Sequence, residues 1–175
     1  ACFQVCPMDD YGNFNLGPQV SDMWGVIRSA RKIIVEVNNN MPQAMGHQTQ
    51  INLYKVDHVV EGSNTPLPEV TQKAPTKIER KIAAHVVERI HDNSTLQLGI
   101  GGLPACIGTL LAESDIKRIN AHSEMLVESY VDLFEAGKLT GSKRHDRGKA
   151  VYTFAGGTKR LYDFIDMNPI CCSAP

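Results

Sequence analysis

The spacing of apolar residues along the chain predicts short strands and helices in turn. Strands are expected where β-branched and other apolar residues follow one another, and helices where apolar residues recur every three to four positions. The expected strands are residues 1–6, 32–37, 54–60, 95–98, 118–121 and 151–154. The expected helices are residues 21–31, 76–90, 104–111, 126–136 and 158–164. From residue 76 onward the two kinds alternate at short spacing, which is typical of an α/β unit with an open, mostly parallel sheet.

The segment 76–90 has the pattern of a capped amphipathic helix. Thr76 and Glu79 have the spacing of a capping box, in which each side chain accepts a hydrogen bond from the backbone N–H of the other residue. Apolar residues then recur at every fourth position, at Ile78, Ile82, Val86 and Ile90. This spacing places them on one face of the helix.

Composition divides the chain before this helix. Residues 61–75 contain one glycine and three prolines but few large apolar residues, which is the composition of a linker. We therefore predict the end of a first α/β domain at 1–62, an inter-domain linker at 63–75 and the first part of a second α/β domain at 76–175. The chain opens directly on an apolar strand and closes on another extended segment, so we expect a piece of a larger protein.

Net charge, apolar content and the spacing of cysteines and histidines bear on which partners and metals the protein is expected to bind. The 175 residues carry a formal net charge of −1, which gives no support to a nucleic-acid partner. No apolar stretch approaches the length needed to span a bilayer, so no membrane partner is predicted. Five cysteines without CxxC pairs and six histidines without ligand spacing predict no metal and a cytoplasmic location. The basic run Lys143, Arg144, Arg147 and Lys149 is a candidate anion contact, with a solvated loop as the alternative.

A glycine-rich loop is the first candidate for chemistry. Gly99, Gly101 and Gly102 follow a predicted strand, and Pro104 is well placed as the first residue of the next helix. Glycines there let a ligand approach the backbone, and the start of a helix favours an anion or a developing oxyanion. The pattern is not that of a dinucleotide-binding loop. Tight packing between strand and helix is the alternative interpretation.

Glu124 is the second candidate, because it lies directly after the predicted strand 118–121. In open α/β sheets ligands bind beyond the carboxyl ends of the strands. Glu124 and the glycine loop therefore share one sheet edge if their strands are parallel neighbours. A carboxylate there is a candidate nucleophile, general base or metal ligand, and a surface or helix-capping glutamate is the alternative. His122 is a candidate for polarising a substrate, with a structural histidine as the alternative.

Several short motifs, in order along the whole chain, resemble the acetyl-CoA hydrolase/transferase family, and most of all its 4-hydroxybutyrate and butyrate:acetate CoA-transferases. In the second half they are residues 94–104 (STLQLGIGGLP), 122–125 (HSEM), 131–137 (VDLFEAG) and 162–166 (YDFID). In the first half they are residues 7–12 (PMDDYG), 17–18 (GP), 34–38 (IVEVN), 40–42 (NMP), 60–62 (VEG) and 66–68 (PLP). Each motif is modest, and the resemblance rests on their joint occurrence.

The resemblance implies a fold and a mechanism. Members of this family fold as two similar α/β domains that hold the CoA thioester between them. The residue matching Glu124 is the nucleophile that forms a glutamyl-CoA thioester, and such covalent catalysis predicts ping-pong kinetics. Coenzyme A is then a co-substrate, and the backbone at Gly99, Gly101 and Gly102 is expected to bind CoA or the oxyanion. Cleft-lining roles are expected by analogy for Asn38, Asn40, Met41, His122 and Met125, with a structural loop as the alternative for the first three.

The resemblance leaves three questions open. Water in place of the second carboxylate would make the enzyme an acyl-CoA hydrolase, and a non-catalytic nucleotide-binding or regulatory module would not need Glu124. The partners expected are acyl-CoA and small carboxylates, and the oligomeric state is open, with a homodimer common among relatives. Relatives are more than twice as long as this chain, so we expect the 175 residues alone to be inactive.

Overall fold

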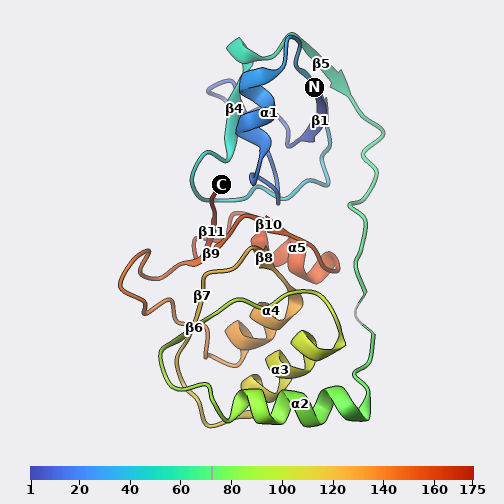
Figure 1. Ribbon diagram of the computed structural model, residues 1–175. Helices are drawn as coiled ribbons and strands as arrows, with labels where there is room; N and C mark the ends of the chain where they lie inside the picture. The colour runs from blue at the N-terminus through green and yellow to red at the C-terminus, as the bar shows by residue number, and fades with distance from the viewer. Residues whose placement is uncertain (72) are drawn as a thin grey trace.

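The first part of the chain forms a small parallel sheet with one helix on it. The structure is a computed structural model that describes residues 1–71 and 73–175. Strands β1 (Cys2–Val5), β3 (Ile34–Val37) and β5 (His58–Glu61) are parallel in the order β1-β3-β5. Strands β2 (Asn13–Asn15) and β4 (Gln50–Asn52) form an antiparallel pair, β4 leads into the 3-10 helix η1 (Leu53–Lys55), and helix α1 is Met23–Ser29. Their apolar residues make a core of their own at the top of Figure 1.

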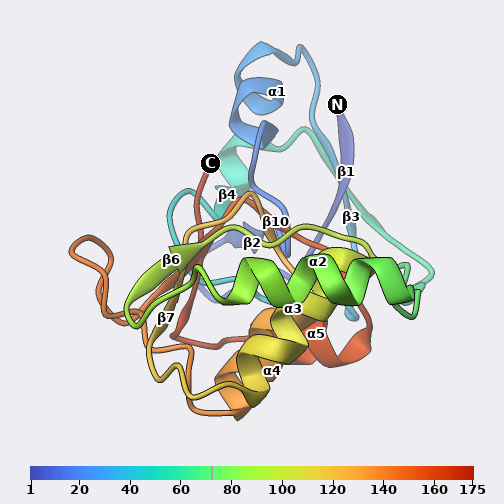
Figure 2. The ribbon, with the colours of Figure 1, turned by 60° about the horizontal axis from the view of Figure 1, so that its bottom comes forward.

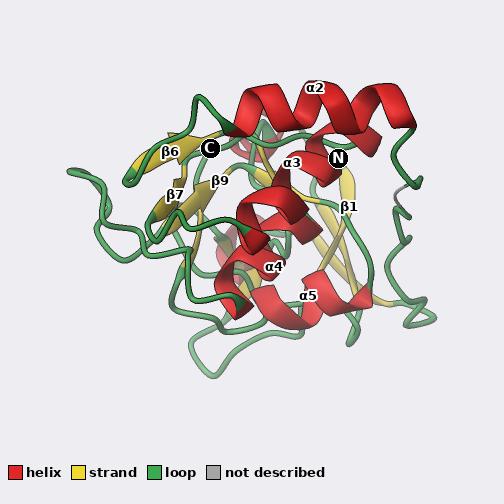
Figure 3. Ribbon diagram, turned by 90° about the horizontal axis from the view of Figure 1, so that it is seen from below, coloured by secondary structure: helices red, strands yellow, loops and turns green. Residues whose placement is uncertain are grey.

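The second part of the chain alternates helices with short parallel strands. Its helices are α2 (Lys77–Val87), α3 (Gly102–Glu113), α4 (Glu128–Glu135) and α5 (Lys159–Ile165). Its strands are β6 (Ser94–Leu96), β7 (Ile119–Ala121), β8 (Met125–Leu126), β9 (Ala150–Tyr152), β10 (Phe154–Ala155) and β11 (Cys171–Ser173). The pairs β6-β7, β8-β10 and β9-β11 are all parallel. A parallel bridge between His122, directly after β7, and Val151 in β9 connects two of these pairs. Helices α2 to α5 pack against one another in chain order (Figure 3).

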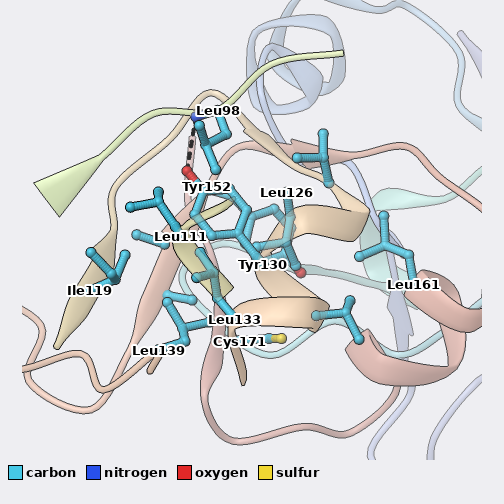
Figure 4. Close-up of a cluster of buried hydrophobic side chains, with 14 of the residues drawn as sticks. Leu98, Leu111, Ile119, Leu126, Tyr130, Leu133, Leu139, Tyr152, Leu161 and Cys171 are labelled. Atoms are coloured by element: carbon cyan, nitrogen blue, oxygen red, sulfur yellow. Dashed lines mark hydrogen bonds between the residues drawn. The ribbon is translucent and has the colours of Figure 1, made fainter. Parts of the chain in front are cut away.

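A second apolar core fills the space between these helices and strands. Figure 4 shows its fully buried members, which include Leu111 from α3, Ile119 from β7, and Tyr130 and Leu133 from α4. The alternation of helix and parallel strand predicted from residue 76 onward is confirmed. The predicted strand 54–60 begins too early, because Tyr54 lies in η1 and extended structure resumes only at His58.

Helix α2 has the predicted cap but buries a different face. The capping box is present, with the Glu79 N–H donating to Thr76 Oγ1 at 3.2 Å and the Thr76 N–H donating to Glu79 Oε2 at 2.7 Å. The fully buried residue of α2 is Ala83, whereas Ile78 is 71% exposed and Ile82 is 44% exposed. Helix α2 lies in front of α3 in Figure 2. A small residue at the contact lets the two helices approach, so the larger residues are left beside the contact.

The described residues of the predicted linker lie along the outside of the molecule between β5 and α2 (Figure 1). No helix or strand is assigned to residues 62–71 or 73–76, and residue 72 lies outside the described residues. The segment is nevertheless held, because the Val70 N–H donates to Gly157 O at 2.9 Å and Tyr162 Oη donates to Pro68 O at 2.9 Å. The division of the chain into domains at this segment stays a prediction.

Backbone hydrogen bonds join the two parts where the loops of the first meet β9 to β11. The Val20 N–H donates to Thr153 O at 3.1 Å, and the Ala155 N–H donates to Pro18 O at 2.8 Å. Ser173 in β11 exchanges bonds with the chain on both sides of Gly46. Gly46 has φ +146°, and a Cβ there would lie 1.9 Å from Ser173 O. Only glycine lets the two segments approach this closely.

Two helices near this junction are tied together by the carboxylate of Glu128. Its Oε1 accepts hydrogen bonds from the Thr158 N–H at 2.8 Å and from Thr158 Oγ1 at 2.6 Å, at the start of α5. Arg160 donates to Asp132 at 2.8 Å and to Glu135 at 2.6 Å on α4. Glu128 therefore serves as a cap for α5, supplied by α4.

Replacing Asp57 with asparagine is expected to destabilise the first part in a pH-dependent way. Hydrogen bonds from Lys32 Nζ at 2.6 Å and from the Ile33 N–H at 2.9 Å hold the pKa of Asp57 below its ordinary value. A carboxylate whose pKa is lower in the folded state stabilises the fold at neutral pH, and that contribution is lost as the pH falls through the folded value. The measurement is the melting temperature of wild type and Asp57→Asn from pH 7 to 2.

The two melting curves should differ at pH 7 and converge as the pH falls below about 3.9, the ordinary aspartate pKa. Asp115→Asn is the matched control, because Asp115 is exposed. It should change the melting temperature little throughout. A difference for Asp57→Asn that stays constant down to pH 2 would contradict the assigned role.

Candidate active site

Glu124 lies in a turn whose backbone is fixed on both sides. The turn follows β7 and leads into β8. Glu124 O accepts hydrogen bonds from the N–H groups of Thr153 at 3.0 Å and Phe154 at 3.2 Å. The Ser123 N–H donates to Val151 O at 2.9 Å, and the His122 N–H donates to Leu96 O at 3.2 Å. The side chain of Glu124 is exposed. A rigid backbone thus presents a free carboxylate, as a nucleophile or base requires.

This carboxylate lines a cavity of about 400 Å³ beyond the carboxyl ends of β6, β7 and β9. The cavity wall combines residues from the Gly46 loop, the end of β6, the β7–β8 turn and the last residues of the chain. Its lining residues are His47, Gln97, His122, Ser123, Glu124, Asp146, Val151, Tyr152, Thr153, Cys172, Ala174 and Pro175. The structure therefore brings two predicted residues, Glu124 and His122, into one cavity.

The glycine loop lies at the same sheet edge as Glu124. Strands β6 and β7 are parallel and pair Leu96 with Ala121, so the loop and the Glu124 turn both follow the carboxyl ends of neighbouring strands. Gly101 is the N-cap of α3 with φ +130°, a conformation that favours glycine. A Cβ at Gly99 would meet nothing within 4 Å. Gln97 lines the Glu124 cavity, whereas the three glycines are not among its lining residues.

Asn38, Asn40 and Met41 lie away from Glu124. Asn38 is fully buried and structural: its Nδ2 donates to Thr65 O at 2.8 Å and its Oδ1 accepts from the Asn40 N–H at 2.9 Å. Asn40 and Met41 line a different cavity of about 470 Å³ between their loop, the segment after Pro66 and α5. Met125 is half-buried against the second core. In this chain these residues do not share a cavity with Glu124.

The basic run divides into two structural and two exposed side chains. Lys143 Nζ donates to the backbone carbonyls of Asp146 and Lys149, and Lys149 Nζ donates to Pro169 O. Burial lowers the pKa of Lys143. Arg144 and Arg147 are exposed. The two lysines therefore hold the loop in shape, while Asp146 at its tip reaches the Glu124 cavity.

The cavity also contains residues that the sequence did not mark. His47 and Cys172 enter it because β11 pairs with the Gly46 loop, more than a hundred residues earlier in the chain. No pattern of neighbouring residues predicts this contact between the Gly46 loop and β11. Burial raises the pKa of the Cys172 thiol, which disfavours the reactive thiolate form. Glu124 remains the candidate nucleophile.

Within residues 1–71 and 73–175, no three His, Cys, Asp or Glu side chains are grouped so that they would hold a metal ion. Over the same residues, no helix has the length and apolar content needed to cross a bilayer.

Comparison with known proteins relates the chain to one family. Residues 1–71 match the model of the acetyl-CoA hydrolase/transferase N-terminal domain. The butyryl-CoA:acetate CoA-transferase of Anaerostipes caccae is 43% identical over 178 residues, which are 100% of this chain and 40% of that protein. The chain belongs to the acetyl-CoA hydrolase/transferase family. It spans about two fifths of the length of the curated relatives that it matches.

Other members extend the match over both parts of the chain. The 4-hydroxybutyrate coenzyme A transferase of Clostridium kluyveri is 36% identical over 97% of this chain and 39% of its own length. The crystal structure of RipA from Yersinia pestis superimposes with a TM-score of 0.91 at 34% identity, covering 97% of this chain and 39% of RipA. The family match therefore includes the glycine loop and the Glu124 turn, which lie outside the N-terminal domain model.

Proposed function

We propose that the protein containing this chain is a CoA-transferase that moves CoA between a short-chain acyl-CoA and a small carboxylate. The observation that carries the proposal is the exposed carboxylate of Glu124 on a fixed turn, facing a cavity at the carboxyl ends of parallel strands. The names of the relatives support the substrate class, since they specify butyryl-CoA, acetate and 4-hydroxybutyrate. CoA is the co-substrate in this proposal.

The proposed reaction needs a carboxylate nucleophile. A Glu124 oxygen attacks the thioester carbonyl, the carbon–sulfur bond breaks, and a mixed anhydride and CoA thiolate result. The thiolate then attacks the glutamyl carbonyl, which releases the first carboxylate and leaves a glutamyl-CoA thioester. A second carboxylate attacks this thioester, and the same steps in reverse yield its CoA ester and free Glu124. A carboxyl group suits this role because it alone among side chains forms an anhydride with acyl-transfer potential comparable to a thioester.

The remaining predicted residues have supporting roles in this proposal. The backbone N–H groups near Gly101 and Gly102, at the start of α3, are placed to bind an oxyanion or part of CoA. Gly99 leaves open space for the approach of a ligand. His122 faces the same cavity as Glu124. A homodimer in the cytoplasm remains the prediction from sequence.

Borohydride trapping on the full-length protein tests this function. After incubation with acetyl-CoA, reduction of a glutamyl thioester converts the side chain of Glu124 into an alcohol, which peptide mass spectrometry locates. Initial rates with varied acyl-CoA and carboxylate should give the parallel double-reciprocal lines of a ping-pong reaction. A Glu124 that stays unmodified under turnover, together with intersecting lines, would refute the covalent mechanism.

The same assay separates the alternatives. A hydrolase consumes acyl-CoA at full rate without any acceptor carboxylate, whereas a transferase requires the acceptor. A non-catalytic module binds CoA without consuming acyl-CoA under either condition. The transferase is favoured because the relatives described above are CoA-transferases by name.

A further inference from the structure

The hydroxyl of one buried tyrosine bridges the strand that leads to the glycine loop. Tyr130 lies in the first turn of α4 and is fully buried. Its Oη accepts a hydrogen bond from the Leu98 N–H at 2.9 Å and donates one to Leu96 O at 3.0 Å. Figure 4 shows the hydrogen bond between Leu98 and this hydroxyl as a dashed line. Leu98 directly precedes Gly99.

The Tyr130 hydroxyl makes hydrogen bonds to this segment that a neighbouring strand would otherwise make. The β6–β7 ladder ends at Leu96, whose carbonyl also accepts from the His122 N–H at 3.2 Å. Beyond Leu96 the chain leaves the sheet and enters the glycine loop. A backbone N–H buried without a partner costs free energy, and Tyr130 supplies the partner for Leu98. The position of the last residue before the glycines is therefore set by a side chain of α4.

The same hydroxyl lies beside the turn that carries Glu124. Ser123, the residue before Glu124, is buried, and its Oγ donates to Leu98 O at 3.5 Å. Burial raises the pKa of Tyr130, so its hydroxyl keeps its proton at neutral pH and remains a donor. Leu98 is thus held on one side by Tyr130 and on the other by Ser123. The contacts link the glycine loop to the Glu124 turn through two side-chain hydroxyls.

We propose that Tyr130 is a positioning residue that sets the glycine loop 99–102 relative to Glu124. The inference rests on the proposed transferase function, in which Glu124 attacks and the loop backbone binds the oxyanion or CoA. Catalytic groups must be held to within about 0.5 Å of the productive geometry, and a misplacement of about 1 Å costs up to roughly 100-fold in rate. The phenol ring fills the core, and the hydroxyl alone performs the positioning.

Tyr130→Phe in the full-length protein removes the hydroxyl and keeps the ring. The expected result is a fall in kcat of about 10- to 100-fold with a smaller change in the KM for the acceptor carboxylate. Hydrogen exchange of the peptide covering Leu98 to Gly102 should become faster, because the Leu98 N–H loses its acceptor. Exchange in α2, which does not contact the hydroxyl, should not change.

Leu133→Val is the matched control. Leu133 lies on the same helix and is also fully buried, but it contacts neither the glycine loop nor the Glu124 turn through a hydrogen bond. We expect both substitutions to lower the melting temperature, but in Leu133→Val kcat and exchange at residues 98–102 should stay at wild-type values. This comparison separates positioning of the loop from a general loss of stability.

The outcomes distinguish the inference from the function on which it rests. Unchanged kcat and unchanged exchange at residues 98–102 in Tyr130→Phe would overturn the inference, even where wild type transfers CoA. Equal loss of kcat in Tyr130→Phe and Leu133→Val would overturn it as well. Absence of transfer by wild type would instead overturn the proposed function, and the exchange measurement would still decide whether the Tyr130 hydroxyl holds the loop.

Discussion

Replacing Glu124 with glutamine in the full-length protein is expected to lower the rate of CoA transfer by on the order of 10⁴-fold or more, a size typical of loss of a covalent nucleophile. Glutamine has nearly the same shape, but its amide is a poor nucleophile and forms neither an anhydride nor a thioester. The fold should be unaffected, since the hydrogen bonds that fix this turn involve the backbone carbonyl of Glu124. Steady-state kinetics and borohydride trapping measure the effect.

A second glutamate provides the control. Glu113 lies at the exposed end of α3, and Glu113→Gln should leave kcat, KM and the melting temperature close to wild type. Glu124→Gln should also retain its affinity for acyl-CoA, because the cavity and the glycine loop remain. CoA transfer at the wild-type rate by Glu124→Gln would show that Glu124 is not the nucleophile, whatever the stability of the variant.

Gly108→Ala is expected to destabilise the protein by about 1–3 kcal/mol in the free energy of unfolding. Gly108 lies in α3 where this helix meets α4, and a Cβ there would lie 2.4 Å from both Cβ and Oγ of Ser129 and 3.3 Å from its Cα. The added methyl group must therefore push the two helices apart. Alanine normally improves a helix relative to glycine by about 1 kcal/mol, so the steric conflict reverses the usual sign.

The same substitution at Gly25 tests this explanation. Gly25 lies within α1, and a Cβ there would meet nothing within 4 Å. Gly25→Ala should be neutral or stabilising by about 0.5–1 kcal/mol in urea or thermal unfolding. Combining Gly108→Ala with Ser129→Gly should recover part of the loss, because the atoms in conflict are removed. A stabilising Gly108→Ala would show that α3 and α4 separate without cost.

Local sequence predicted where the glycine loop and Glu124 lie, but it did not predict what Glu124 does. The strand before Gly99, the helix after it and the strand before Glu124 all follow from local patterns of apolar residues and glycine. Parallel pairing then places the carboxyl ends of β6 and β7 at one edge. The role of Glu124 did not follow from position alone, because an isolated carboxylate after a strand is also typical of a surface group. Its interpretation as a nucleophile depended on the resemblance to a family.

Helix α2 shows where periodicity was insufficient. The recurrence of Ile78 and Ile82 predicts an amphipathic helix, and the capping box predicts where it begins. Apolar periodicity does not show which element the helix packs against. The contact with α3 selects the side carrying Ala83, since close approach of two helices requires a small residue there.

By itself the sequence determined the alternation of helices with parallel strands in the second part, the cap of α2 and the placement of Glu124 after one of these strands. These depend on residues near one another in the chain, where apolar spacing and capping chemistry act directly. Only the tertiary structure decided that His47 and Cys172 share a cavity with Glu124, that Asn40 and Met41 line another, and that Tyr130 holds Leu98. Those relations join residues far apart in sequence, and they exist only once the strands have paired and the helices have packed.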